Sequence, residues 1–229
     1  MATVRLPGGP TLSYQEWGRP DAAVVLLLHG LTSSSRSWRN VAPALGERFR
    51  VLAPDARGHG GSEWMRDYSL EVMRDDVARF MEQVGILAAI VVGHSMGAVT
   101  AYDLAATRPE LIRLLVLEEM PPPDPATPPK PFPRRPDRGA DYDWRALIAV
   151  HRWRNAPPPS WWERAAQIQA TTLVLGAARS DLRQDRMEEL SRRIPHATFA
   201  SMNTNDGGHE ERPSEFLMRV EPFISWFAK

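Results

Sequence analysis

The sequence predicts an α/β fold, a mostly parallel sheet with helices on both faces. Short, continuously apolar runs are typical of strands buried on both faces. Such runs occur at residues 23–28, 50–53, 90–92, 114–117 and 171–175. Between some of them lie segments in which apolar residues recur every three or four positions, as in an amphipathic helix. Because strands and helices alternate along the chain, most strands are expected to run parallel.

The remaining elements follow from turn signals and apolar spacing. Thr3–Leu6 and Thr11–Trp17 are expected to form two strands joined by a turn at residues 7–10, and residues 197–201 to form a short final strand. Helices are expected over residues 70–84, after Gly97, over 184–193 and from Pro213 onward. The apolar faces that predict the first and last helix are Leu70, Met73, Val77, Phe80, Met81 and Val84, and Phe216, Val220, Phe223, Ile224 and Phe227.

Residues 120–168 interrupt this alternation. Nine of the seventeen residues from 120 to 136 are proline, which excludes helix interior and central strand there. Two short helical stretches follow, at about 142–154 and 161–169, and the segment holds four of the eight tryptophans. A disordered linker would not need so much aromatic surface, so residues 120–168 are predicted to form a short lid on a core made of 1–119 and 169–229. The lid is rich in arginine, for which a solvated face is favoured over anion binding: Arg134, Arg135, Arg138, Arg145, Arg152, Arg154 and Arg164.

Composition narrows the class of protein. The 229 residues carry 28 basic and 28 acidic side chains, so nothing favours nucleic acid or an anionic membrane as a partner. The absence of cysteine excludes disulfides and thiolate chemistry. No apolar run reaches the roughly 20 residues of a membrane helix, and the first residues lack the apolar centre of a signal peptide. We therefore expect a cytoplasmic protein that uses no metal or cofactor; its oligomeric state stays open.

Ser95 is the predicted nucleophile. It is the centre of Gly93-His94-Ser95-Met96-Gly97, which follows an apolar strand and precedes a run of good helix formers. A sharp strand-to-helix turn strains the serine and exposes its hydroxyl, and glycine is needed on either side because a larger side chain would collide with a neighbouring element. The pattern predicts a nucleophile elbow.

His209 is the predicted general base. It follows the last strand in Gly207-Gly208-His209 and precedes Pro213. A histidine on a flexible loop at this point can reach a serine at the edge of the sheet. Of the other histidines, His94 is expected to point away from Ser95. His29 and His59 lie beside glycines in loops, where they are expected to stabilise turns by hydrogen bonding.

The acid that orients His209 is predicted to be Asp181, with Glu118 and Glu119 as alternatives. Asp181 follows the strand at 171–175, and the chain order Ser95, Asp181, His209 is the one expected of a serine elbow on an α/β sheet. Glu118 and Glu119 end the preceding strand, so their carboxylates would point into the same space.

Two backbone amides are expected to form an oxyanion hole. The N–H of Met96 points to the site from the helix N-terminus, and the N–H of Leu31 is the predicted second donor, because Gly30 lets the loop after the strand at 23–28 approach closely.

These motifs together resemble the α/β-hydrolase superfamily. The matching pieces are His29-Gly30, the run from Asp55 to Ser62, the pentapeptide around Ser95, residues 173–176 with Asp181, and Gly208-His209. The resemblance covers everything except the lid and implies a three-layer fold with an eight-stranded sheet whose second strand is antiparallel. It also implies that Asp55, Arg57, His59 and Ser62 shape a structural loop. Asp181 lies five residues after Gly176, where relatives usually have three or four, and this departure keeps the two glutamates open.

The predicted function is hydrolysis of a small-molecule ester, thioester or lactone through an acyl-serine intermediate. The substrate surface is expected to include Trp38, Trp144, Trp153 and Trp161. Haloperoxidase, lyase or carbon–carbon hydrolase chemistry on the same residues is one alternative, and a non-catalytic ligand-binding module is another. Ser95 speaks against dehalogenase or epoxide hydrolase chemistry, because relatives with those activities use an aspartate nucleophile.

Overall fold

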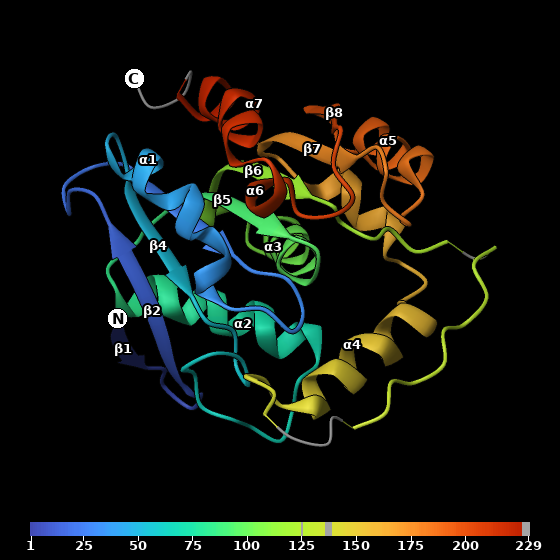
Figure 1. The fold of residues 1–229 in the computed structure, drawn as a ribbon, viewed down its shortest axis with the longest axis horizontal. Coiled ribbons are helices and arrows are strands. Elements are labelled where there is room, and N and C mark those ends of the chain that lie inside the picture. Colours follow the sequence, from blue (N-terminus) through green and yellow to red (C-terminus); the bar gives the residue numbers. More distant parts are fainter. Residues whose placement is uncertain (125, 136–138, 226–229) are drawn as a thin grey trace.

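The computed structural model describes residues 1–124, 126–135 and 139–225, and shows the predicted strands joined in one eight-stranded sheet (Figure 1). The sheet order is β1-β2-β4-β3-β5-β6-β7-β8, and β2 is antiparallel to both neighbours while the other neighbouring pairs are parallel. The strands are β1 (Ala2–Arg5), β2 (Thr11–Trp17), β3 (Val24–Leu28), β4 (Arg50–Pro54), β5 (Ala89–His94), β6 (Ile112–Glu118), β7 (Thr171–Ala177) and β8 (Ala197–Met202). The sequence-based strand predictions are confirmed.

Helices cover both faces of the sheet. They are η1 (Ser35–Asn40), α1 (Ala42–Gly46), α2 (Leu70–Gln83), α3 (Met96–Thr107), η2 (Pro109–Leu111), α4 (Trp144–Asn155), η3 (Trp162–Gln167), α5 (Gln184–Arg193), α6 (Gly208–Glu211) and α7 (Pro213–Ser225). Alternate strand residues explain the two layers of core. Leu26 and Val91 share a buried cluster with α2, α3 and α5, whereas Leu27 and Val92 share another with η1, α1 and α7.

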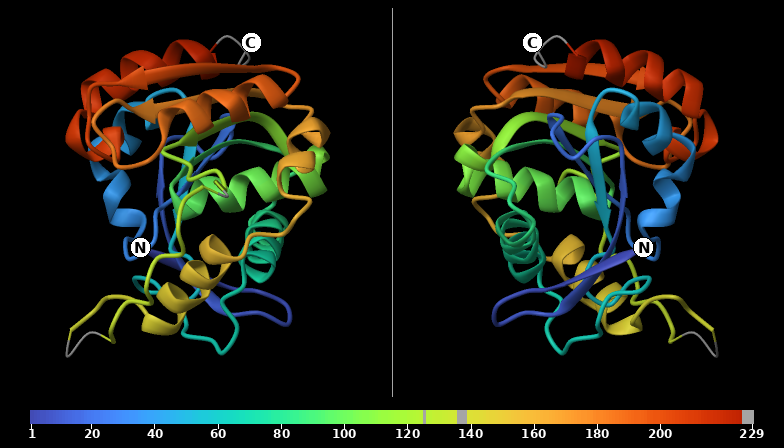
Figure 2. Two further views of the ribbon diagram at one scale, coloured as in Figure 1. Left: turned by 90° about the vertical axis from the view of Figure 1, so that its right-hand side faces the viewer. Right: turned by 90° about the vertical axis from the view of Figure 1, so that its left-hand side faces the viewer.

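The segment predicted as a lid carries the two expected helical stretches, α4 and η3. Figures 1 and 2 show α4 lying outside the sheet and its covering helices. The start of α4 is tied to the core where Asp143 donates its N–H to the Gly58 carbonyl at 2.7 Å and accepts a hydrogen bond from the Tyr68 hydroxyl at 2.7 Å. Its second stretch is held where the Tyr102 hydroxyl donates to the Trp161 carbonyl at 2.7 Å. Arg138 and Phe227, both named in the sequence-based expectations, lie outside the described residues.

Candidate active site

Ser95 stands between β5 and α3 in a strained backbone conformation. Its φ is 50° and its ψ is −112°, a region that costs a residue other than glycine about 1–3 kcal/mol. Hydrogen bonds on either side hold the turn, since the Ser95 N–H donates to the Glu118 carbonyl at 2.9 Å and the Ser95 carbonyl accepts from the Val99 N–H at 3.0 Å. The predicted elbow geometry is therefore present.

The two glycines that flank Ser95 are required by close approach of backbone. A Cβ placed on Gly93 would lie 2.5 Å from the carbonyl oxygen of Gly97, and a Cβ on Gly97 would collide with the carbonyl of Leu28. The helix start thus presses directly on the end of β3, as the sequence pattern predicts.

His209 lies on the short helix α6, where the sequence predicts a flexible loop. Its side chain is fully buried. The Trp38 ring stacks on the imidazole with centroids 3.9 Å apart, and the Phe216 ring meets it edge-on at 6.0 Å. Packing on both aromatic rings fixes the orientation of the imidazole.

Glu118, at the end of β6, is the carboxylate that holds His209. Its Oε2 lies 2.7 Å from His209 Nδ1, and its Oε1 accepts the His209 backbone N–H at 3.0 Å. Burial opposes ionisation, but the charge and the hydrogen bonds of His209 outweigh it and lower the pKa of Glu118 below the ordinary value. An ionised Glu118 can only accept, so Nδ1 carries the proton and Nε2 is left as the basic nitrogen.

The prediction of Asp181 as the acid beside His209 is wrong in its geometry. Strand β7 runs on to Ala177, and the turn after it leaves the Asp181 side chain exposed on the rim of a separate pocket. Asp181 makes no hydrogen bond with the described residues. Glu118 was one of the two alternatives that the sequence left open, and it occupies the position beside His209.

Glu119, the other alternative, has a different role. Its carboxylate accepts the Ala177 N–H at 2.6 Å and a hydrogen bond from Gln184 at 3.2 Å, so it holds the turn after β7. Its φ of 44° turns the chain away from β6. Burial raises the pKa of Glu119 above the ordinary value.

Ser95 and His209 are joined through Glu118, without a direct hydrogen bond between them. Ser95 bonds the backbone carbonyl of Glu118, while His209 bonds its carboxylate. His209 Nε2 is buried and has no partner among the described residues. The hydrogen bond between the Ser95 hydroxyl and the His209 imidazole that a serine nucleophile and its base would share is thus not formed in this structure, although Glu118 anchors both residues.

His94 lies next to the imidazole of His209, with ring centroids 4.9 Å apart. Its Nε2 lies 3.1 Å from Oδ1 of Asp206. Burial lowers the pKa of His94, but the hydrogen bond to Asp206 and the charge of Glu118 outweigh it and leave the pKa raised. The side chain therefore links the elbow to the loop before α6, a contact that the sequence does not signal.

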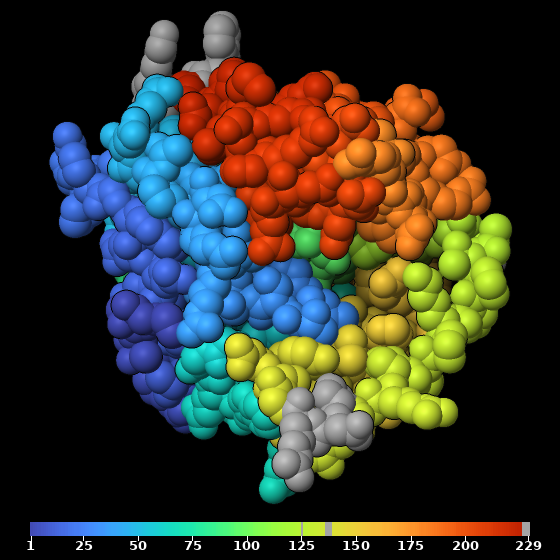
Figure 3. Space-filling model, viewed as in Figure 1, coloured from blue at the N-terminus to red at the C-terminus, as the bar shows by residue number. Residues whose placement is uncertain are grey.

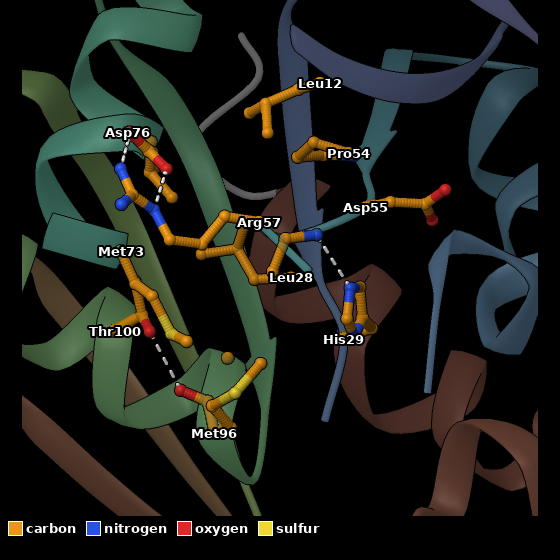
Figure 4. A pocket seen from close by; sticks show the side chains of 13 residues that line it. Leu12, Leu28, His29, Pro54, Asp55, Arg57, Met73, Asp76, Met96 and Thr100 are labelled. Atoms are coloured by element: carbon orange, nitrogen blue, oxygen red, sulfur yellow. Dashed lines mark hydrogen bonds and ion pairs between the residues drawn. The ribbon is translucent and has the colours of Figure 1, made fainter. Parts of the chain in front are cut away.

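The predicted oxyanion donors lie beside Ser95. Met96 is the first residue of α3, so its N–H has no carbonyl partner within the helix. A Cβ on Gly30 would lie 3.5 Å from the Ser95 Cβ, which shows how closely the loop bearing Leu31 passes the elbow. His29 fixes this loop by donating Nδ1–H to the Gly30 carbonyl at 2.8 Å. Its Nε2 accepts the Ala56 N–H at 2.9 Å (Figure 4).

The loop from Asp55 to Ser62 has the structural role that the resemblance implies. Asp55 accepts the backbone N–H groups of Ser35 and Gly61, and Ser62 donates to the Asp55 carbonyl at 2.7 Å. Arg57 forms a buried two-point ion pair with Asp76, both contacts at 2.6 Å. This pair lines a small cavity behind Met96 (Figure 4), which Ser95 does not line.

A second cavity contains Ser95 and is the candidate substrate site. It is small, about 30 Å³, and Figure 3 shows a depression bounded by the segment after β3, the segment around α6 and the segment around α4. Its lining is apolar apart from Ser95 and Arg154, and the apolar members are Leu31, Leu70, Met96, Val99, Pro121, Val150 and Trp153.

Of the four tryptophans predicted to form the substrate surface, one lines this cavity. Trp153 does so from α4. Trp38 is fully buried against His209, and Trp161 stacks on Tyr102 with centroids 4.5 Å apart. Trp144 lies under the guanidinium of Arg135, outside the cavity. These three do not line the Ser95 cavity, because their rings pack against other side chains, but Trp161 lines the larger pocket beside it.

Comparison with known proteins places this geometry in context. Residues 23–150 match the family model described as alpha/beta hydrolase fold. The chain is 36% identical over 119 residues to the AB hydrolase superfamily protein YfhM of Bacillus subtilis, covering 50% of this chain and 42% of that protein. It is 39% identical over 107 residues to the sn-1-specific diacylglycerol lipase ABHD11 of Mus musculus, covering 46% and 35%. The matched part thus spans about two fifths of these relatives.

A solved structure matches the whole chain. The enol-lactonase from Burkholderia xenovorans superposes with a TM-score of 0.87 at 21% identity, covering 98% of this chain and 100% of that one. Relatives of comparable identity also include an epoxide hydrolase and a haloalkane dehalogenase. The comparisons therefore show the family, whose members cleave different kinds of bond. In the described part of the chain, no helix is long and apolar enough to cross a membrane, and no group of three acidic or histidine side chains is arranged to hold a metal.

Proposed function

This chain belongs to the α/β-hydrolase fold family, and on that premise we propose that it is a serine hydrolase that cleaves a carboxylic ester, thioester or lactone. Ser95 attacks the acyl carbonyl, and His209 Nε2 takes the hydroxyl proton and later returns it to the leaving group. Glu118 holds the imidazole in the required tautomer and stabilises its protonated form. Water then releases the acyl group from Ser95 by the same steps.

The oxyanion of the tetrahedral intermediate is received by the N–H groups of Met96 and Leu31. Fixed backbone donors of this kind stabilise the transition state more than the ground state, and the loss of one costs about 3 kcal/mol in comparable sites. The two hydrogen bonds that fix the His29 ring support this assignment, because they hold the Leu31 loop against the elbow.

The observation that carries the proposal is the double hydrogen bond between Glu118 and His209. Burying a carboxylate costs free energy unless the group is well paired. Glu118 is paired through both oxygens, with the imidazole and the backbone N–H of the same histidine. Such an arrangement beside a strained serine has a direct use in acyl transfer. The names of two relatives, a diacylglycerol lipase and an enol-lactonase, favour ester or lactone chemistry.

Labelling with a fluorophosphonate tests the proposal. We expect the probe to modify the protein at Ser95, and Ser95→Ala to lose both the label and turnover of short-chain nitrophenyl esters. Ser214→Ala, which changes an exposed serine on α7, is the matched control and should keep both. A folded wild-type protein that takes no label and turns over no ester would support a binding module instead.

A further inference from the structure

Arg154 differs from the other arginines that are buried or half-buried in the described part of the chain. Each of those has a carboxylate oxygen within 4.0 Å; they are Arg50, Arg57, Arg74, Arg79, Arg164 and Arg186. Arg154 is half-buried in the last turn of α4, yet its guanidinium makes no hydrogen bond or ion pair with the described residues. Burial lowers its pKa below the ordinary value, and no acid among the described residues counters this effect.

An unpaired guanidinium in such a position has lost part of its hydration without a compensating partner. This arrangement costs free energy, and a half-buried arginine on a helix surface could avoid it by turning outward. Arg152, two residues earlier on the same helix, is exposed in this way. A charge-assisted hydrogen bond from Arg154 to an anionic group of a bound molecule would offset this cost.

The position of Arg154 identifies that molecule as the substrate. Arg154 and Ser95 line the same cavity, and the other lining residues are apolar. Pro121, Trp153 and Arg154 also line the larger adjoining pocket, so Arg154 stands where the two spaces meet. Two of the cations that line that pocket, Arg183 and Arg186, are already paired with carboxylates, those of Asp124, Asp185 and Glu189. Its other cations are Lys130 and Arg154.

We propose that Arg154 binds a carboxylate carried by the substrate, so that the preferred esters, thioesters or lactones are monoanions with an apolar segment between the carboxylate and the scissile carbonyl. This inference rests on the proposed serine hydrolase function and names its substrate class. One guanidinium balances one negative charge and can offer two parallel N–H donors to a carboxylate, which favours a carboxylate over a doubly charged phosphate.

Matched substrates test the proposal. The anionic one is the mono-4-nitrophenyl ester of adipic acid, and the neutral one is its methyl ester at the far carboxyl group, which has the same chain. We expect the wild-type protein to have the higher kcat/KM for the anion. Arg154→Met should lower the ratio of the two kcat/KM values by about 10–100-fold, as expected for the loss of a charge-assisted hydrogen bond.

Two controls separate charge from structure. Arg154→Lys should retain part of the preference, and Arg152→Met should retain all of it. A ratio unchanged by Arg154→Met, or a wild-type protein without preference for the anion, would overturn the role of Arg154.

Binding to Ser95→Ala, measured by calorimetry with the anionic ester, provides a readout that does not need turnover. We expect Arg154→Met in that background to raise Kd about tenfold or more. An unchanged Kd would refute the carboxylate site even if esters are cleaved. Conversely, the wild-type protein could lack esterase activity and still bind the anionic ester more tightly than Arg154→Met does. That result would refute the proposed function and support the carboxylate site.

Discussion

Replacing Glu118 by glutamine should disable catalysis while preserving the shape of the site. Glu118 accepts two hydrogen bonds from His209, at 2.7 Å from Nδ1 and at 3.0 Å from the backbone N–H. A glutamine has one acceptor oxygen and one NH₂ group, so it cannot accept both. Its NH₂ group must either face a buried N–H or donate to Nδ1.

The magnitude follows from these two outcomes. If the new NH₂ donates to Nδ1, the proton of the imidazole moves to Nε2, which can then no longer accept the proton of Ser95. Comparable charge-removing changes lower kcat by about 10⁴-fold, or about 5 kcal/mol. If the NH₂ instead faces the backbone N–H of His209, a buried donor loses its partner, and the free energy of unfolding falls by about 1–3 kcal/mol.

The assay measures kcat for the hydrolysis of a nitrophenyl ester, and thermal unfolding of each variant shows that it is folded. Asp181→Asn is the matched control, because this exposed side chain makes no hydrogen bond with the described residues. It should stay within about twofold of the wild-type protein. Glu118→Asp, which keeps the charge on a shorter side chain, should fall between the two.

The reasoning would be refuted if Asp181→Asn abolished turnover while a folded Glu118→Gln kept kcat close to wild type. The exposed aspartate would then have to reach His209 through a rearrangement of the turn after β7, and the geometry described above would not be the catalytic one.

Two further predictions concern the scaffold of the site. Gly97→Val should abolish labelling of Ser95 by the fluorophosphonate and lower the unfolding midpoint, because the new side chain would collide with the Leu28 carbonyl; normal labelling would contradict the packing argument. The second concerns acid: burial and the charge of His29 lower the pKa of His59 from 6.5 to about 3, so the unfolded chain binds a proton below pH 6.5 that the folded protein excludes. Above pH 6.5 His59 is neutral in both the folded and the unfolded state and does not oppose folding. As the pH falls from 6.5 towards 3, it should lower the free energy of unfolding by about 1.4 kcal/mol per pH unit. Between pH 7 and pH 5, the free energy of unfolding measured with urea should fall more for the wild-type protein than for His59→Asn. An equal fall in both proteins would contradict the assignment.

The sequence was sufficient where the signal is local. Apolar runs predicted five of the eight strands, and turn signals with apolar spacing predicted the other three. The glycines around Ser95 predicted the elbow, because a tight turn restricts which side chains fit. The acid was harder to predict. Asp181 and the two glutamates follow neighbouring strands, and spacing alone does not say which carboxylate faces the imidazole.

The substrate surface was also beyond local reasoning. Trp38 and Trp153 are the same residue type, yet one is sealed against His209 while the other faces the Ser95 cavity. Arg154 likewise cannot be told from the other lid arginines until the positions of all neighbouring carboxylates are known.

The sequence by itself determined the α/β architecture, the strained serine and the histidine after the last strand, because each depends on backbone requirements within a few residues. Only the tertiary structure decided that Glu118 holds His209 and that Arg154 lines the cavity without a partner among the described residues. Those facts depend on which side chains from distant segments meet at the carboxyl ends of the strands, and on which charges are left unpaired when they do.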